Sequence, residues 1–254
     1  MRRPLLRAKC GMRLRRRARD TEFPGLFVTG TDTGVGKTWV AAGLLAALRR
    51  RGIDAVPMKP VQTGCAGRGA ALRAPDLESS LAAAGLVPAP GERALMAPYL
   101  FRPACSPHLA AERAGVRIDL ARIARAARAL AAAREFVCVE GAGGVLVPLD
   151  GKLTMVDVMR QLGLPVLLVA RAGLGTINHT LLSLRVLRES GLNVAGVVFN
   201  QTEQGPWGLI EDDNVETVAR LGRVSMAVCL RHQAGRRGAA ANRQAFERLA
   251  GLIY

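Results

Sequence analysis

A glycine-rich run ending in Gly36-Lys37-Thr38 contains the residues with the clearest chemical meaning in this sequence. Glycine allows tight backbone turns, and the N–H groups at the start of a helix attract anionic oxygens. A lysine at this place reaches the β- and γ-phosphates of a nucleotide, and the hydroxyl beside it can bind Mg²⁺. The sequence therefore predicts a phosphate-binding loop. Its expected nucleotide contacts are Thr33, Gly34, Val35, Gly36, Lys37 and Thr38.

The spacing of this loop is unusual. Five residues separate Gly30 from Gly36, whereas four separate the two glycines of the common phosphate-loop pattern. The longer spacing narrows the set of families to which the chain can belong.

Two charged residues are expected beside this loop, because each follows or ends a short apolar run. Lys59 comes directly after one such run, and Glu140 ends another. A cation near a bound phosphate stabilises the anions formed during its transfer, and a carboxylate opposite the loop commonly supplies a second contact to Mg²⁺. We therefore expect catalytic roles for Lys37 and Lys59, and a metal contact from Glu140. Further candidate metal carboxylates are Asp76 and Asp32.

Short apolar runs alternate with longer helical patterns along the chain. The runs are apolar on both faces, as is typical of buried parallel strands joined by crossover helices. This pattern predicts an α/β fold in three layers, with a mostly parallel sheet between helices, as in P-loop NTPases. Ligands of such folds bind beyond the carboxyl ends of the strands. We expect strands at 26–29, 55–58, 136–140, 166–170 and 194–199, helices at 37–51, 120–134 and 176–190, and loops at 64–75 and 202–214.

The charge of the chain is strongly positive but unevenly distributed. The 254 residues hold 36 Lys and Arg against 20 Asp and Glu, a formal net charge of +16. Residues 1–22 account for +7 of this, from nine basic and two acidic residues. We interpret 1–22 as a basic disordered arm or leader, and 23–254 as a single domain. A nucleic-acid-binding arm is the less favoured alternative.

Composition excludes several other classes of protein. Half of the residues are hydrophobic, which argues against a wholly disordered chain, and no apolar run reaches the length that a membrane-spanning helix needs. The five cysteines and three histidines are scattered without a Cys-x-x-Cys pair, so neither a disulfide framework nor a zinc site is indicated. The cytoplasm is the expected compartment.

Five motifs in a fixed order identify a family resemblance. They are GTDTGVGKT, KPVQTG, SPHLAAE, VEGAGG and LGTINHTLLSL. The chain resembles the dethiobiotin synthetase family, a group of ATP- and Mg²⁺-dependent cyclo-ligases of biotin biosynthesis. The resemblance implies that CO₂ and 7,8-diaminononanoate are converted to dethiobiotin, ADP and phosphate. The route would pass through a carbamate and a carbamic-phosphoric anhydride.

The same resemblance implies roles for particular residues. Thr38, Asp76 and Glu140 would hold Mg²⁺, and Lys59 would stabilise the carbamate. Thr63 and Gly143 would belong to the substrate site.

The resemblance also implies a homodimer with its site at the interface. The substrate carboxylate would meet the helix start at Thr176, Ile177 and Asn178 of the partner subunit. We expect Asn178 to be the N-cap of that helix or a direct ligand. His108 and His179 are expected to be structural rather than catalytic.

The C-terminal part departs from the family pattern. Asn200 matches the family's adenine-reading asparagine, but Gln201 follows where aspartate is common. The family's Gly-x-x-Pro segment after the sixth strand is missing from residues 222–227. Selectivity for the nucleotide base is therefore left open, whereas the phosphate site is not.

Two alternatives share the phosphate loop. A partition or cell-division type ATPase would act as a regulatory switch, but its loop would carry an additional early lysine, and residues 31–34 contain none. An amidotransferase-linked ligase of the same superfamily is the second alternative. The switch ATPase gives no role to KPVQTG or GTINH.

Overall fold

The computed structural model describes residues 23–67, 69, 72–232 and 235–254. The arm predicted at 1–22 lies outside the described residues. Within the described part, parallel strands form a six-stranded sheet in the order β2-β5-β1-β6-β7-β8. A separate pair, β3 and β4, is also parallel. The strands are β1 (Gly25–Gly30), β2 (Ala55–Met58), β3 (Val61–Gln62), β4 (Tyr99–Leu100), β5 (Phe136–Gly144), β6 (Val166–Arg171), β7 (Val194–Asn200) and β8 (Ala227–Leu230).

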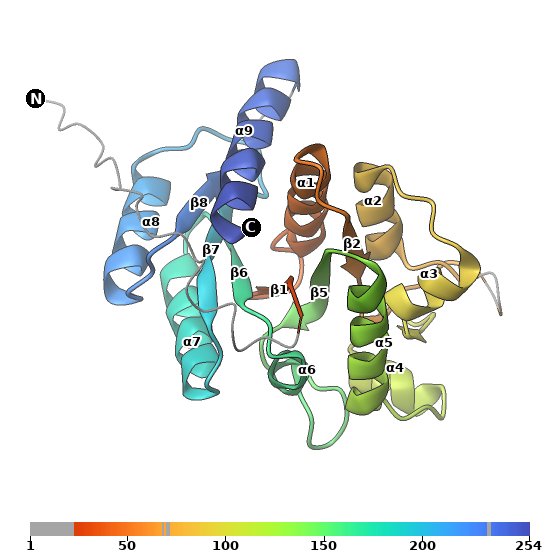
Figure 1. The fold of residues 1–254 in the computed structure, drawn as a ribbon. Coiled ribbons are helices and arrows are strands. Elements are labelled where there is room, and N and C mark those ends of the chain that lie inside the picture. Colours follow the sequence, from red (N-terminus) through yellow and green to blue (C-terminus); the bar gives the residue numbers. More distant parts are fainter. Residues whose placement is uncertain (1–22, 68, 70–71, 233–234) are drawn as a thin grey trace, which may run out of the picture.

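Helices cover both faces of the large sheet (Figure 1). Successive residues of β1 point to opposite layers, because side chains alternate along a strand. Leu26 and Val28 pack with α1 and α9, whereas Phe27 packs with the cluster that includes α5 and α6. The helices are α1 (Lys37–Arg50), α2 (Pro75–Ala84), α3 (Pro90–Met96), α4 (Pro107–Arg113), α5 (Leu120–Ala133), α6 (Met155–Leu162), α7 (Thr176–Glu189), α8 (Leu209–Leu221) and α9 (Gly235–Ile253).

The expected α/β fold, with its mostly parallel sheet, is confirmed, and the predicted strands and helices agree closely with the observed ones. The loop predicted at 202–214 is wrong in its second half, because α8 begins at Leu209. The Glu211 carboxylate accepts a hydrogen bond from the Gly208 N–H at 2.8 Å, and the acidic first turn suits the positive end of a helix. Likewise, the loop predicted at 64–75 ends where Pro75 starts α2.

The sheet order brings five strand ends to one edge of the sheet. β2, β5, β1, β6 and β7 are parallel neighbours, so the residues that end them or follow them share this edge. The predicted site residues on the large sheet lie near these carboxyl ends: the phosphate loop follows β1, Lys59 follows β2, Glu140 and Gly143 lie within the second half of β5, and Asn200 ends β7. Among the described helices, none has both the length and the apolar character needed to cross a membrane.

Candidate nucleotide and metal site

The phosphate loop joins the end of β1 to the start of α1. Gly34 and Gly36 have φ values of +77° and +93°, a region that other residues rarely adopt. The loop folds back on Lys37, whose ammonium donates to the Asp32 carbonyl at 2.9 Å. Lys37 is only 7% exposed although it begins a helix. The loop therefore has the shape and the cation that phosphate binding requires.

Asn200, at the end of β7, packs directly on this loop. Its side-chain amide donates to the Val35 carbonyl at 3.0 Å. A Cβ added to Gly36 would collide with the same amide nitrogen. The glycine is therefore required both by its backbone angle and by the approach of Asn200.

Lys59 lies at the centre of a buried polar cluster. Its ammonium is 2.7 Å from a carboxylate oxygen of Asp76 and 2.7 Å from one of Glu140, and it donates to the Gly141 carbonyl at 3.1 Å. The Thr38 hydroxyl donates to the same Glu140 oxygen at 2.8 Å. Motifs that are far apart in the sequence thus meet at one point. We call Lys37, Thr38, Lys59, Asp76 and Glu140 the phosphate cluster.

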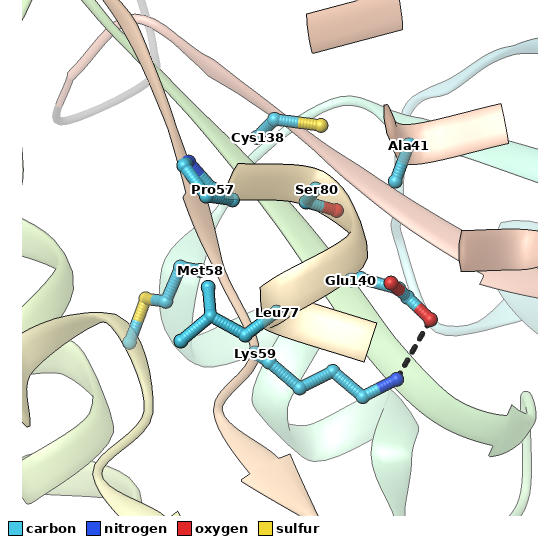
Figure 2. Close-up of a pocket in the computed structure, with 8 residues that line it drawn as sticks. All are labelled: Ala41, Pro57, Met58, Lys59, Leu77, Ser80, Cys138 and Glu140. Atoms are coloured by element: carbon cyan, nitrogen blue, oxygen red, sulfur yellow. Dashed lines mark hydrogen bonds and ion pairs between the residues drawn. The ribbon is translucent and has the colours of Figure 1, made fainter. Parts of the chain in front are cut away.

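The wall behind Lys59 is largely apolar (Figure 2). The lysine stem runs past Leu77, and its charged end points toward Glu140. The cavity beside it holds only about 10 Å³, which is no more than a single water needs. The cavity is lined by Ala41, Pro57, Met58, Lys59, Leu77, Ser80, Cys138 and Glu140.

Burial and neighbouring charges shift the pKa values of this cluster. Burial by itself lowers the pKa of Lys59, but Glu140 and Asp76 outweigh it and raise that pKa above its ordinary value. Burial likewise favours neutral Asp76, yet the Lys59 ammonium lowers the pKa of Asp76 overall. Lys37 differs, because burial and the nearby Lys59 lower its pKa from 10.5 to about 8. Lys59 is therefore the firmly charged cation of the free site.

Gln62 holds Asp76 in place, a role that the sequence did not reveal. Its amide nitrogen donates to Asp76 at 3.2 Å and to the Thr63 carbonyl at 2.9 Å, while its oxygen accepts from the Asp76 N–H at 3.3 Å. Gln62 is buried, and its motif was recognised without this role being assigned. A polar side chain inside an otherwise apolar strand pair was the available signal.

The donors in the cluster suit a hard divalent cation. Two carboxylates meet at one ammonium, the Thr38 hydroxyl contacts one of them, and Mg²⁺ prefers such oxygen ligands. The described residues contain no group of three or more His, Cys, Asp or Glu that could hold a metal. The site would therefore depend on nucleotide oxygens and water for its remaining ligands.

Asp32, a further candidate for the metal, lies elsewhere. Its carboxylate accepts from the N–H of Thr33 at 2.6 Å and is 3.4 Å from the Arg171 guanidinium at the end of β6. Its side chain is 53% exposed, unlike that of Glu140. Arg171 was not among the predicted site residues. It braces the phosphate loop from the neighbouring strand.

The expected substrate residues lie around the same edge. Gly143 has a φ of +62°, and a Cβ at this position would come within 3.5 Å of the Thr33 hydroxyl. Thr63 follows Gln62 directly and is half-buried. Gly143 therefore borders the phosphate loop, and Thr63 borders the residue that holds Asp76.

The start of α7 differs from the expectation for Asn178. Gly175 is the N-cap, with a φ of +87°, and Asn178 is the third residue of the helix, so the predicted N-cap is wrong. The positive φ of Gly175 therefore places the N-cap three residues earlier than expected. The Thr176 hydroxyl is buried against that of Thr180 at 3.2 Å, Ile177 packs on the core, and Asn178 is exposed.

The two histidines take different positions. His179 is exposed on α7, and its carbonyl accepts from Ser183. Nδ1 of His108 is buried and has no hydrogen-bond partner among the described residues. His108 is the second residue of α4, its backbone N–H donates to the Pro148 carbonyl at 3.2 Å, and it makes no hydrogen bond to the phosphate cluster among the described residues.

The expectation that residues 222–227 follow the sixth strand of the large sheet is wrong. That strand is β8, and the segment leads into its first residue, Ala227. The residues that follow the strand are Arg231 and His232. Gln201 joins the two strand ends, because its amide nitrogen donates to the Gly205 carbonyl and its oxygen accepts from the His232 N–H. The Arg231 guanidinium lies 5.4 Å from the ring centre of Trp207. We call Gln201, Gly205, Trp207, Arg231 and His232 the β7–β8 rim.

The parallel sheet, the loop between β1 and α1 and the buried lysines together define a P-loop nucleotide-binding protein. A family model described as "AAA domain" matches residues 24–235. The cell-division ATPase MinD of Pyrococcus furiosus has a similar fold, with a TM-score of 0.55 at 18% identity over 91% of this chain and 98% of that chain. The MinC:MinD complex of Aquifex aeolicus gives a TM-score of 0.57 at 13% identity, over 90% and 96%. At these identities the likeness concerns the fold alone.

Relatives with higher sequence identity share a single protein name. The ATP-dependent dethiobiotin synthetase BioD of Anaeromyxobacter dehalogenans (strain 2CP-C) is 50% identical over 78% of this chain and 85% of its own length. The protein of the same name from Pseudomonas paraeruginosa (strain DSM 24068 / PA7) is 43% identical over 80% and 90%. The chain belongs to the dethiobiotin synthetase family.

Proposed function

We propose that this chain catalyses the ATP-dependent closure of a ureido ring from 7,8-diaminononanoate and CO₂, giving dethiobiotin, ADP and phosphate. Family membership supports the reaction. The single observation that carries its chemistry is the convergence of Lys59, Asp76, Glu140 and Thr38 beside the phosphate loop. Every step of this reaction handles an anion, and the cluster supplies fixed cations in a buried setting.

The first amine of the diamine would attack CO₂ to form a carbamate, whose charge the Lys59 ammonium would stabilise. The carbamate oxygen would then attack the γ-phosphorus of ATP while Lys37 and the loop N–H groups hold the phosphates. Attack of the second amine on the carbamate carbon would close the ring and release phosphate. No residue needs to form a covalent bond to the substrate.

Mg²⁺ is the proposed metal, held by Thr38, Asp76 and Glu140 together with the nucleotide. When bound, it would neutralise charge on the transferring phosphate. Gln62 would orient Asp76 toward it, as hydrogen-bond partners of metal ligands commonly do. Asn200 would lie against the nucleoside side of the loop, and Thr63 and Gly143 would contact the diamine or carbamate.

The active form is proposed to be a homodimer. Asn178 and Leu182 lie one turn apart on the exposed face of α7, and Leu174, just before the helix, is 88% exposed. Exposed apolar side chains gathered in one place are typical of a protein interface. In the dimer, the N-terminal turn of α7 (Thr176, Ile177 and Asn178) would receive the substrate carboxylate of the partner's site. Light scattering on a gel-filtration column would test this, and a monomer at assay concentration would contradict it.

We place the reaction in the cytoplasm, with small-molecule partners and no need of a membrane or nucleic acid. The described cysteines Cys65, Cys105, Cys138 and Cys229 are all free, which is typical of a reducing compartment.

An omission assay tests the proposed function. Phosphate release is measured with ATP, bicarbonate and diaminononanoate, leaving out each component in turn. The proposal expects release only when all three are present. Release that ignores the diamine would instead favour a switch ATPase of the partition or cell-division type.

A further inference from the structure

An ammonium lies where the proposed metal ligands converge. Lys59 has three N–H donors, and three acceptors surround it: Asp76 and Glu140 at 2.7 Å each and the Gly141 carbonyl at 3.1 Å. Thr38 donates to the Glu140 oxygen that Lys59 also contacts. The lysine therefore uses the oxygen atoms that a divalent cation would need.

The charges of the free cluster balance. Lys37 and Lys59 carry two positive charges, and Asp76 and Glu140 carry two negative ones. Lys59 and Glu140 are each 4% exposed, and Lys37 is 7% exposed. Adding a divalent cation alone would leave a net positive charge in a buried site, which is costly. A divalent cation that arrives with a triphosphate brings its own compensating charge.

The side chain of Lys59 can move without moving its backbone. The Lys59 N–H donates to the Met96 carbonyl at 2.7 Å, which fixes the main chain at this position. The ammonium stands at the end of a flexible four-carbon stem. Release of a carboxylate then requires only a change of side-chain rotamer, with the main chain held in place.

We infer that Lys59 is a positioning residue that stands in for the metal: it holds Asp76 and Glu140 in the free protein and competes with a divalent cation for them. Metal binding is then coupled to nucleotide binding, and the metal displaces the ammonium from at least one carboxylate. The displaced ammonium becomes available to the carbamate. This inference rests on the proposed function for the identity of the metal ligands.

Mn²⁺ binding to nucleotide-free protein tests the competition. Free Mn²⁺ is measured by electron paramagnetic resonance for the wild type, for Lys59→Met and for Lys37→Met. Methionine is close to lysine in length and uncharged. We expect Lys59→Met to bind Mn²⁺ at least about tenfold more tightly than the wild type, since a competing charge-assisted contact has been removed. Lys37→Met is the matched control, because it removes a nearby charge whose hydrogen bond goes to the Asp32 carbonyl rather than to either carboxylate, and we expect a shift of about threefold or less.

Two results would overturn the inference. One is Mn²⁺ binding by Lys59→Met that is no tighter than that of the wild type. The other is an equal gain in Lys37→Met, which would reduce the effect to general electrostatics.

Unfolding temperature gives a second measurement that does not depend on affinity. Lys59→Met leaves the buried Glu140 and the partly exposed Asp76 without their cation, so we expect its unfolding temperature in EDTA to fall below that of the wild type. Millimolar Mn²⁺ should restore much of the loss in the variant and change the wild type little. Lys59→Gln, which keeps a hydrogen-bond donor, serves where the methionine variant folds poorly. Failure of Mn²⁺ to rescue either variant would refute the exchange of lysine for metal.

The same wild-type preparation is assayed for diamine-dependent phosphate release. Absence of that release would refute the proposed function. The comparison of Mn²⁺ binding between the variants needs no substrate, so it would still test the competition between Lys59 and the metal.

Discussion

The phosphate cluster and the β7–β8 rim differ in burial and in the kind of contacts they make. Lys37, Lys59 and Glu140 are between 4% and 7% exposed and are held by ion pairs or charge-assisted hydrogen bonds. On the rim, Arg231 and His232 are exposed, and Gln201 is bound only to backbone groups. Lys59 and Glu140 have little freedom to change alone, because removal of either would leave a buried charge without its partner.

The difference in burial between the cluster and the rim corresponds to two different requirements of a nucleotide site. Transfer of a phosphoryl group needs fixed charges at fixed positions, and burial makes those charges stronger. A side chain at the rim meets solvent and backbone, so substitutions there cost less. The chain's departure from the family pattern at Gln201 falls on the rim, while the cluster keeps every expected residue.

The largest effect is expected from Lys37→Ala and Lys59→Ala. Each should lower the diamine-dependent rate of phosphate release by about 100-fold to 1000-fold, since a preorganised cation is lost. Lys152→Ala is the matched control, because Lys152 is exposed and belongs to neither region. Unchanged turnover in either variant would remove that lysine from the mechanism.

Two glutamines allow a direct comparison of the regions. Gln62→Leu should raise the Mg²⁺ concentration for half-maximal rate by about tenfold or more, because Asp76 loses its support. Gln201→Leu makes the same chemical change on the rim, and we expect a shift of about twofold or less. Titrations of rate against Mg²⁺ measure both. If the Mg²⁺ concentration for half-maximal rate rose equally in both variants, the proposed difference between the cluster and the rim would be wrong.

Asn200 lies between the two regions and should show an intermediate effect. Asn200→Ala removes the hydrogen bond to the Val35 carbonyl, worth about 1 to 3 kcal/mol when a buried partner is left unsatisfied. We expect KM for ATP to rise by about tenfold while kcat changes little, because the loop loses its support but the cations remain. A fall in kcat with an unaltered KM would place Asn200 in the chemical step instead.

The smallest effect is expected from deleting residues 1–22. Turnover and KM for ATP should stay within about twofold of the full chain, because terminal segments commonly tolerate removal. The assay is the same phosphate release at matched concentration. Loss of activity on truncation would show that the basic segment belongs to the enzyme, and that the comparison between cluster and rim omits a third part of the site.

The sequence predicted the parts of this site that depend on local spacing. Lys37 and Thr38 follow from the loop motif, and Lys59 and Glu140 follow from their places at strand ends. The position of Lys59 between two carboxylates could not be read in this way, because it depends on how β2, β5 and α2 pack. Gln62 was missed for the same reason, since an amide acquires its role from the partner that packing brings to it.

Errors in the C-terminal part have local causes. The residues before and within the first turn of α8 are polar and contain glycine and proline, so they indicated a loop, although acidic side chains there favour a helix start. Asn178 was preferred as an N-cap by residue type, whereas Gly175 takes that position by its backbone angle. Residues 222–227 were assigned to the wrong side of the sixth strand because β8 is short and half-exposed.

The hydrogen bond between Asn200 and the Val35 carbonyl spans 165 positions of the chain. A loop whose own residues are consecutive thus takes part of its shape from a residue synthesised much later. During translation, a chain that has not yet emerged through β7 carries the complete phosphate motif without the support that Asn200 gives it. Since contacts of such long range are slow to form, nucleotide capture would come late in folding, after β7 has joined the sheet.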